Sequence, residues 1–227
     1  LPAGRLKSKP AGDDDRMVRA RRALFDTGAY RPVHDAVAGA VAAHSPQVVL
    51  DSGCGEGTYL ASIIERTGAA GIGIDISKVA VRLAARRHRD HRYAVASAHV
   101  LPLDDAVVDA VVSVFSPRDF VEMGRVLDND GVIVVASPGA GHLRQLKELI
   151  YDSPRDHREP PEDDHGAWRT IAEEVVRFTL PLPQEVQRLQ LLQMTPYWWS
   201  TDEARRHRVW ESATEVDVDV LVRTYAR

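Results

Sequence analysis

An apolar segment that ends in an acidic residue leads directly into a glycine-rich turn. Residues 48–51 form this segment, and Asp51 is its last residue. Glycine has no Cβ atom and tolerates positive φ, so backbone N–H groups in such a turn can closely approach a nucleotide-like ligand. A second apolar segment, 71–75, ends in Asp75, whose carboxylate can accept hydrogen bonds from both hydroxyls of a ribose. The two segments together predict a pocket for an adenosine group. The glycines of the turn are Gly53, Gly55 and Gly57.

The spacing of these glycines distinguishes between cofactors. The dinucleotide-binding pattern G-x-G-x-x-G would require glycine at position 58, where the chain has Thr58. The pattern D-x-G-x-G-x-G that starts at Asp51 instead resembles motif I of the class I S-adenosylmethionine-dependent methyltransferases. The resemblance implies S-adenosylmethionine as the cofactor and methyl transfer as the reaction.

Strands and helices are expected to alternate after the turn, which predicts an α/β protein with a doubly wound sheet. The methyltransferase resemblance implies seven strands, of which the last is antiparallel. Residues 46–227 are expected to form this domain, with a flexible surface loop near 152–167 because that segment is polar and rich in proline. The expected strands are 48–51, 71–75, 92–96, 108–115, 131–137 and 215–225, and the expected helices are 58–67, 77–88, 119–127 and 142–151.

Residues 1–45 are expected to form a basic arm and an N-terminal helical extension. Residues 1–12 combine Pro, Gly, Lys and Arg, which favours an extended arm, whereas the spacing of apolar residues predicts two helices that end near Gly28 and Ala43. Residues 1–31 hold eight Lys or Arg and four Asp, a local charge of +4, so the rest of the chain carries −8 to give the total of −4. This asymmetry marks either an RNA-facing edge or a solvated helix face.

Composition narrows the class of protein. The chain has 227 residues, of which 44% are hydrophobic, and this length supports one well-packed α/β domain. The only cysteine is Cys54, which excludes an internal disulfide. No apolar stretch has the length of a membrane span and no signal peptide is visible, so we expect a cytoplasmic enzyme that does not contact membranes.

Several segments outside the glycine turn resemble the RlmA-type large-subunit (23S) rRNA guanine-N1 methyltransferases, a family that includes tylosin-resistance enzymes. The most specific are the Arg-rich segment 17–32 and the Leu-Leu-Gln-Met-Thr-Pro segment 191–196, and weaker matches cover 75–80, 96–102 and 137–143. The resemblance implies methylation of guanine N1 in a hairpin of 23S rRNA, with macrolide resistance in the tylosin-resistance subgroup. It also implies contacts to the cofactor from Tyr30, Tyr59, Leu60 and His142, and contacts near the adenine from Ser97, Ala98 and His99.

The family normally begins with a small zinc-binding module of three Cys and one His, and this chain starts after that module. We therefore expect no metal site in this chain.

Methylation of guanine N1 requires the removal of a proton, because N1 is protonated at neutral pH. N1 also lies on the Watson–Crick edge, so the base must be unpaired or everted before it can react. Asp119 and His99 are candidates for the proton acceptor. Capping of the following helix is the simpler role for Asp119.

Basic and aromatic residues provide candidate contacts to RNA. Arg19, Arg21 and Arg22 are predicted to bind phosphate, and Arg118 follows the fourth strand, where substrate normally enters. The alternative for these arginines is solubility. Trp198 is predicted to stack on a base, with packing as its alternative role.

Two other functions are open at this stage. A small-molecule methyltransferase acting on an antibiotic or quinone intermediate would need a closed apolar pocket instead of an open basic groove. A cofactor-binding protein without catalysis would bind S-adenosylmethionine without turnover. The sequence does not determine the oligomeric state, and a homodimer is one candidate.

Overall fold

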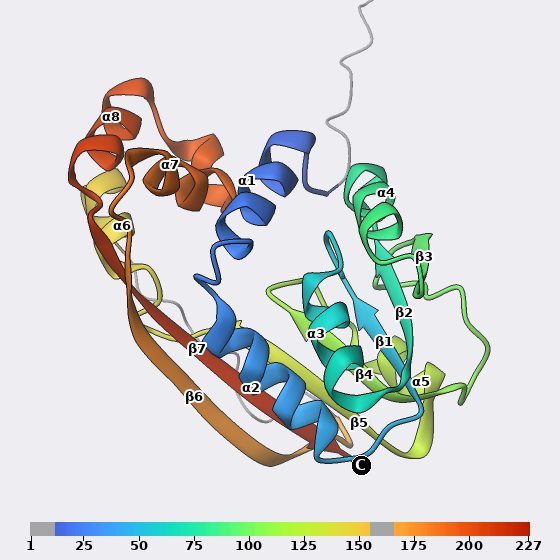
Figure 1. Cartoon of the computed structure of the whole chain (residues 1–227). Coiled ribbons are helices and arrows are strands. Elements are labelled where there is room, and N and C mark those ends of the chain that lie inside the picture. Colours follow the sequence, from blue (N-terminus) through green and yellow to red (C-terminus); the bar gives the residue numbers. More distant parts are fainter. Residues whose placement is uncertain (1–11, 155–165) are drawn as a thin grey trace, which may run out of the picture.

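The computed structural model describes residues 12–154 and 166–227, which form one sheet flanked by helices (Figure 1). The strands are β1 (Val48–Ser52), β2 (Ala70–Asp75), β3 (Arg92–Val95), β4 (Val108–Val114), β5 (Leu127–Pro138), β6 (Arg169–Pro181) and β7 (Glu215–Ala226). The helices are α1 (Asp15–Phe25), α2 (Arg31–Ala42), α3 (Thr58–Thr67), α4 (Lys78–Arg87), α5 (Phe120–Val126), α6 (Arg144–Ile150), α7 (Glu185–Gln193), α8 (Glu203–Ser212) and the short 3₁₀ helix η2 (Pro196–Ser200).

The order of the seven strands is β3-β2-β1-β4-β5-β7-β6. The pairs from β3 to β5 are parallel, whereas β7 is antiparallel to both β5 and β6. The predicted fold, a seven-stranded class I methyltransferase sheet with an antiparallel last strand, is therefore confirmed.

The central strands are apolar on both sides because helices cover both faces of the sheet. Val49 and Val112 pack with α2 and α3 on one face, whereas Leu50 and Val111 pack with α5 on the other. Alternating side chains of a strand point to opposite faces, so strands buried on both faces need apolar residues at nearly every position. Helices α1 and α2 contribute Leu24, Val33, Val37 and Val41 to the same core.

The sequence did not predict β6, α7 or α8. Strand β6 is an edge strand in which only Val176 and Leu180 are buried, so it lacks the apolar pattern that marks an inner strand. Strand β5 also begins at Leu127, before the predicted start at residue 131, because the segment Asp128–Gly131 continues the strand instead of forming a turn. Most of the predicted loop near 152–167 and nearly all of the predicted arm lie outside the described residues.

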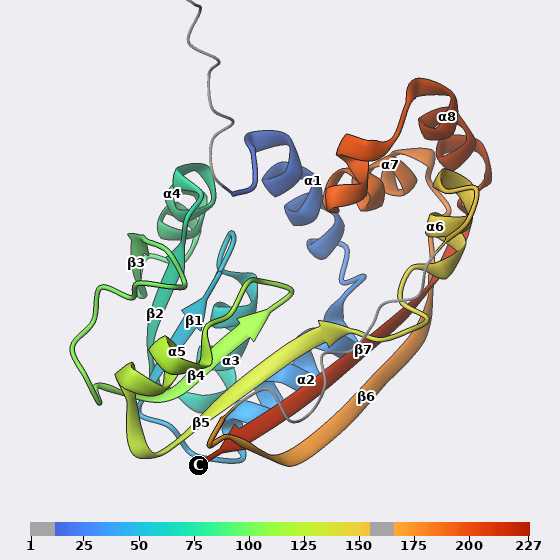
Figure 2. The same ribbon diagram turned by 180° about the vertical axis from the view of Figure 1, so that it is seen from behind.

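The carboxyl ends of the parallel strands lie at the same edge of the sheet, and helices surround that edge. Figure 2 shows α1, α4 and α7 at this end of the molecule, with β6 and β7 extending towards α6, α7 and α8. Ligands of doubly wound proteins bind at this edge. None of the helices in the described part of the chain has the length and apolar character that a membrane span requires.

Candidate active site

The glycine turn connects β1 to α3 and is fixed to β2 by backbone hydrogen bonds. The N–H groups of Gly53 and Cys54 both donate to the carbonyl of Ile74, at 2.7 and 2.9 Å. All three glycines of the turn have positive φ. A Cβ atom on Gly53 would overlap the side chain of Ser116, which lies after β4. Glycine is therefore required at position 53 both by the backbone conformation and by the approach of a neighbouring segment.

Asp75 lies at the end of β2 and holds the glycine turn. Its Oδ2 atom accepts a hydrogen bond from the N–H of Gly55 at 2.9 Å, and Oδ1 accepts one from the N–H of Ser77 at 2.7 Å. Burial raises the pKa of Asp75, while these two hydrogen bonds act in the opposite direction. Each carboxylate oxygen retains a second lone pair, so the predicted contact with ribose is compatible with both bonds.

A pocket of about 1040 Å³ lies between the glycine turn, α1 and the segment that follows α7. Most of the residues predicted to contact the cofactor line this pocket. Leu60 and Gly57 do not. Leu60 is fully buried in the core, and a Cβ atom added to Gly57 would lie only 2.6 Å from the hydroxyl oxygen of Tyr93. The predicted residues that line the pocket are Tyr30, Gly53, Gly55, Tyr59, Asp75, Ser97, Ala98, His99 and His142.

Several buried polar groups near the glycine turn have no hydrogen-bond partner among the described residues, and three of them concern the pocket. They are the carboxylate of Asp51 and the hydroxyls of Tyr30 and Tyr59. Burial, followed by the charge of Asp75, raises the pKa of Asp51 to about 7. Buried polar groups are normally paired, so this part of the pocket is suited to a polar ligand group. The two tyrosines line the pocket, and Asp51 lies behind the turn.

Arg21 lies inside the pocket and not on the outer surface of α1. One guanidinium nitrogen is 2.6 Å from a carboxylate oxygen of Asp13, and the other donates to the carbonyl of Met194 at 3.2 Å. The same group lies next to Gly55, at 3.4 Å from the position that a Cβ would occupy. Arg21 thereby connects the two segments that carry the most specific family resemblance, 17–32 and 191–196. The other two predicted phosphate ligands of α1, Arg19 and Arg22, are paired with Asp15 and Asp26.

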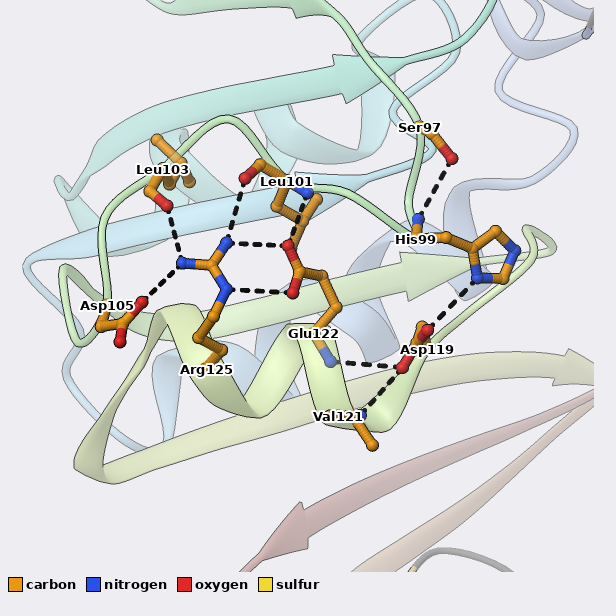
Figure 3. A network of polar contacts seen from close by, with 9 residues as sticks. All are labelled: Ser97, His99, Leu101, Leu103, Asp105, Asp119, Val121, Glu122 and Arg125. Carbon is orange, nitrogen blue, oxygen red and sulfur yellow. Dashed lines mark hydrogen bonds and ion pairs between the residues drawn. The ribbon is translucent and has the colours of Figure 1, made fainter.

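His99 and Asp119 lie close together at the start of α5 (Figure 3). His99 Nδ1 is 3.4 Å from Asp119 Oδ2. Asp119 Oδ1 accepts hydrogen bonds from the N–H groups of Val121 and Glu122 at 3.0 and 3.2 Å, which is the capping role that the sequence also suggested. These two hydrogen bonds lower the pKa of Asp119, and the bond from Glu122 has the largest effect. His99 lines the pocket but Asp119 does not.

An ion-pair network in Figure 3 fixes the segment 97–105 against α5. Glu122 accepts a hydrogen bond from the N–H of Leu101 at 2.7 Å and pairs with Arg125 at 2.7 Å. Arg125 also donates to the carbonyls of Leu101 and Leu103 and to the carboxylate of Asp105. The guanidinium holds the pKa of Glu122 at about 2. Sequence reasoning missed this network, although a Glu and an Arg three residues apart on a helix are a readable signal.

The predicted substrate contacts Arg118 and Trp198 occupy different environments. Arg118 lines the pocket and donates to Ser137 Oγ at 3.0 Å, and burial lowers its pKa. Trp198 is 7% exposed, and the guanidinium groups of Arg206 and Arg16 lie 3.9 and 5.4 Å from its ring centre. The ring of Trp198 therefore packs in this structure and offers no open face to a base.

Phe115 is a pocket residue that the sequence did not single out for stacking. It follows β4, has a φ of 50°, and is 41% exposed. Its ring stacks on His142 at a centroid distance of 5.6 Å and an interplanar angle of 28°. A non-glycine residue with positive φ is uncommon and is often found at functional sites. No local sequence signal marks this conformation.

The described residues contain no group of three or more His, Cys, Asp or Glu side chains arranged to hold a metal ion.

The fold, the glycine turn and the acidic end of β2 define a class I S-adenosylmethionine-dependent methyltransferase. Comparison with known proteins agrees, since residues 49–131 match the methyltransferase domain family. The structure also resembles a protein assigned as a methyltransferase of an antibiotic biosynthesis pathway in Anabaena variabilis ATCC 29413. The TM-score is 0.61 at 17% identity, with 86% of this chain and 96% of that chain covered.

Two curated relatives define the family more narrowly. The 23S rRNA (guanine(748)-N(1))-methyltransferase of Streptomyces fradiae is 35% identical over 207 residues, which cover 87% of this chain and 74% of the relative. YxjB of Bacillus subtilis (strain 168), assigned as a 23S rRNA (guanine-N(1)-)-methyltransferase, is 32% identical over 215 residues, or 88% of this chain and 76% of the relative. The chain belongs to the family of 23S rRNA (guanine-N1)-methyltransferases, which confirms the resemblance found in the sequence.

Proposed function

We propose that this enzyme transfers the methyl group of S-adenosylmethionine to N1 of a guanine in a hairpin of 23S rRNA. The observation that carries the proposal is the identity of 35% to the Streptomyces fradiae enzyme over 74% of its length. The pocket supports it, because about 1040 Å³ is at the upper end of the range for ligand pockets and leaves room for a base beside the cofactor. A hairpin loop presents an unpaired guanine whose N1 is accessible.

The chemistry is a displacement in which the bond from N1 to the methyl carbon forms while the bond from sulfur to that carbon breaks. The proton of N1 must leave, and the protein must hold the two reactants in line. We assign proton acceptance to His99, which lines the pocket. If its Nδ1–H donates to Asp119, the Nε2 atom is left as the acceptor. Asp119, whose pKa is lowered, orients the imidazole and does not itself take the proton.

The cofactor is expected to bind with its adenosine at the glycine turn and Asp75, and with its methionine end towards α1. The methionine carboxylate needs a cationic partner, and Arg21 lies beside Gly55 inside the pocket. The unpartnered hydroxyls of Tyr30 and Tyr59 are suited to the polar groups of the same end. We therefore assign Arg21 to the cofactor and not to RNA.

Replacing Arg21 with glutamine is expected to raise the Kd for S-adenosylmethionine about tenfold, because a charge-assisted hydrogen bond is worth about 1.5–3 kcal/mol. Isothermal titration calorimetry measures this change. Arg19→Gln is the control, since Arg19 lies on the same helix and its side chain is 70% exposed. If the Arg21→Gln variant binds the cofactor normally but binds RNA more weakly, the assignment to the cofactor is wrong and Arg21 binds RNA phosphate.

The proposed reaction is tested with an unmodified 23S rRNA transcript and labelled S-adenosylmethionine, with the product nucleoside identified by mass spectrometry. The expected product is 1-methylguanosine. Cofactor binding without any methylated nucleoside would contradict the proposal and would direct attention to small-molecule acceptors. Resistance to tylosin is a separate prediction from the family resemblance, and it is tested by growth of a susceptible host that expresses the protein.

A further inference from the structure

Helix α4 carries a row of basic side chains on its outer face. Lys78, Arg82 and Arg86 are spaced four residues apart, so they lie on one side of the helix at intervals of about 6 Å along its axis. All three residues are exposed, and the helix contains no acidic residue. Within the part of the chain that the structure describes, none of the three side chains forms a hydrogen bond or ion pair. They are a row of uncompensated positive charges.

The fourth basic residue of α4 shows that acidic partners are available nearby. Arg87 lies on the opposite side of the helix, where it forms an ion pair with Asp26 at 2.6 Å and contacts Glu56 at 3.5 Å. These contacts attach α4 to the end of α1 and to the glycine turn. The inner arginine of α4 therefore has a structural role, whereas the three outer cations have none in this structure.

The arginines of α1 provide a second contrast. Arg19, Arg21 and Arg22 each have a carboxylate partner, at 2.6, 2.6 and 3.6 Å respectively. An RNA phosphate would have to compete with these carboxylates at Arg19 and Arg22, whereas Arg21 faces the pocket in which the cofactor is proposed to bind. The outer face of α4 presents its charges without such competition, so it is better suited to bind phosphate than the helix that the sequence favoured.

The outer row of α4 lowers the stability of the helix that carries it. Lys78 and Arg82, and Arg82 and Arg86, are like charges four residues apart, which repel each other on a helix. Lys78 also lies in the first turn, where the helix dipole favours an acidic residue and α4 has none. Repulsion of this kind would be relieved by a bound polyanion.

The row begins at the mouth of the pocket. Lys78 follows Asp75 and Ile76, both of which line the pocket, and Ser77 attaches the start of α4 to Asp13 through a hydrogen bond of 2.7 Å. Figures 1 and 2 show α4 beside α1 at the same end of the molecule as α7. A nucleic acid with one base in the pocket would pass its backbone close to this helix.

We propose that the outer face of α4, formed by Lys78, Arg82 and Arg86, binds the sugar–phosphate backbone of the rRNA next to the guanine that enters the pocket. The proposal rests on the proposed function for the identity of the RNA. Its physical basis is charge complementarity between three unpaired cations and consecutive phosphates.

The test measures binding of a 23S rRNA transcript at several salt concentrations by filter binding. Each lost phosphate contact is expected to reduce the slope of log K against log[salt] by about 0.7–0.9. Arg82→Gln with Arg86→Gln should therefore reduce the slope by about 1.4–1.8 and weaken binding about tenfold at low salt, and Lys78→Gln should have half the effect on the slope. Affinity for S-adenosylmethionine should not change, and the Tm should stay the same or rise.

The matched control is Arg66→Gln with Arg169→Gln. Both arginines are exposed, and neither forms an ion pair among the described residues. They lie at the end of α3 and the start of β6, on the side of the sheet away from the pocket. The control should leave the slope unchanged. Equal slopes for wild type and the α4 variant, or no binding of rRNA by the wild type, would overturn the proposal. The wild type could bind rRNA with the expected effect of the α4 substitutions and still yield no 1-methylguanosine. That result would contradict the proposed reaction but would support the proposal that α4 binds RNA.

Discussion

Alanine at position 53 is expected to weaken cofactor binding strongly and to destabilise the fold. Gly53 has a φ of 87°, which costs an alanine about 1–2 kcal/mol. The new Cβ would also overlap the side chain of Ser116, whose Oγ atom donates to the carbonyl of Ser52 at 2.7 Å. Overpacking of this kind costs about 1–3 kcal/mol more. We therefore expect Gly53→Ala to lower the free energy of unfolding by about 2–5 kcal/mol and to weaken S-adenosylmethionine binding at least about a hundredfold.

Gly68→Ala separates backbone strain from the overlap with Ser116. Gly68 ends α3 with a φ of 72°, and no atom lies within 4 Å of the position of its Cβ. This control should lose only about 1–2 kcal/mol of stability and should bind the cofactor normally. Urea unfolding and calorimetric titration measure the two quantities. Equal losses for the two variants would show that the approach of Ser116 to the turn has no special importance.

The predictable part of the fold is the part with local patterns. The apolar runs of β1, β2 and β4 and the positive-φ glycines between β1 and α3 are encoded by neighbouring residues, so the alternation of strands and helices could be read directly. Strand β6 could not, because an exposed edge strand lacks the apolar alternation on which such a prediction depends. Its position is determined by pairing with β7 along almost its whole length, and pairing between distant segments leaves no local signal.

The same distinction applies to the site. The pairs of Arg19 with Asp15 and of Arg22 with Asp26 are four residues apart and can be read from the sequence. The contact of Arg21 with Met194 spans 173 positions, so the sequence placed Arg21 with the other arginines of α1 although it points into the pocket. Phe115 was missed for a similar reason, since its unusual backbone conformation results from its surroundings after β4.

The affinity for S-adenosylmethionine is expected to fall as the pH is lowered below 7, because of Asp51. Burial raises the pKa of this carboxyl to about 7, so the free protein holds it largely protonated below that pH. S-adenosylmethionine carries a net charge of +1, which favours the ionised carboxylate and lowers its pKa on binding. Binding below pH 7 must therefore expel a proton. We expect the Kd at pH 5.5 to be about 20 times that at pH 7.5, as measured by calorimetric titration.

Asp51→Asn tests this assignment because asparagine has the same shape and does not titrate in this range. The Kd of the variant should change little between pH 5.5 and 7.5, and a retained 20-fold change would assign the proton to another group. Stability provides an independent readout. Since the folded-state pKa of Asp51 lies above its ordinary value, the folded protein binds more protons than the unfolded chain between about pH 4 and 7, and Asp51 makes stability decline as the pH rises through that range. Urea unfolding of the asparagine variant should show a smaller decline, which would link the buried carboxyl behind the glycine turn to both folding and cofactor binding.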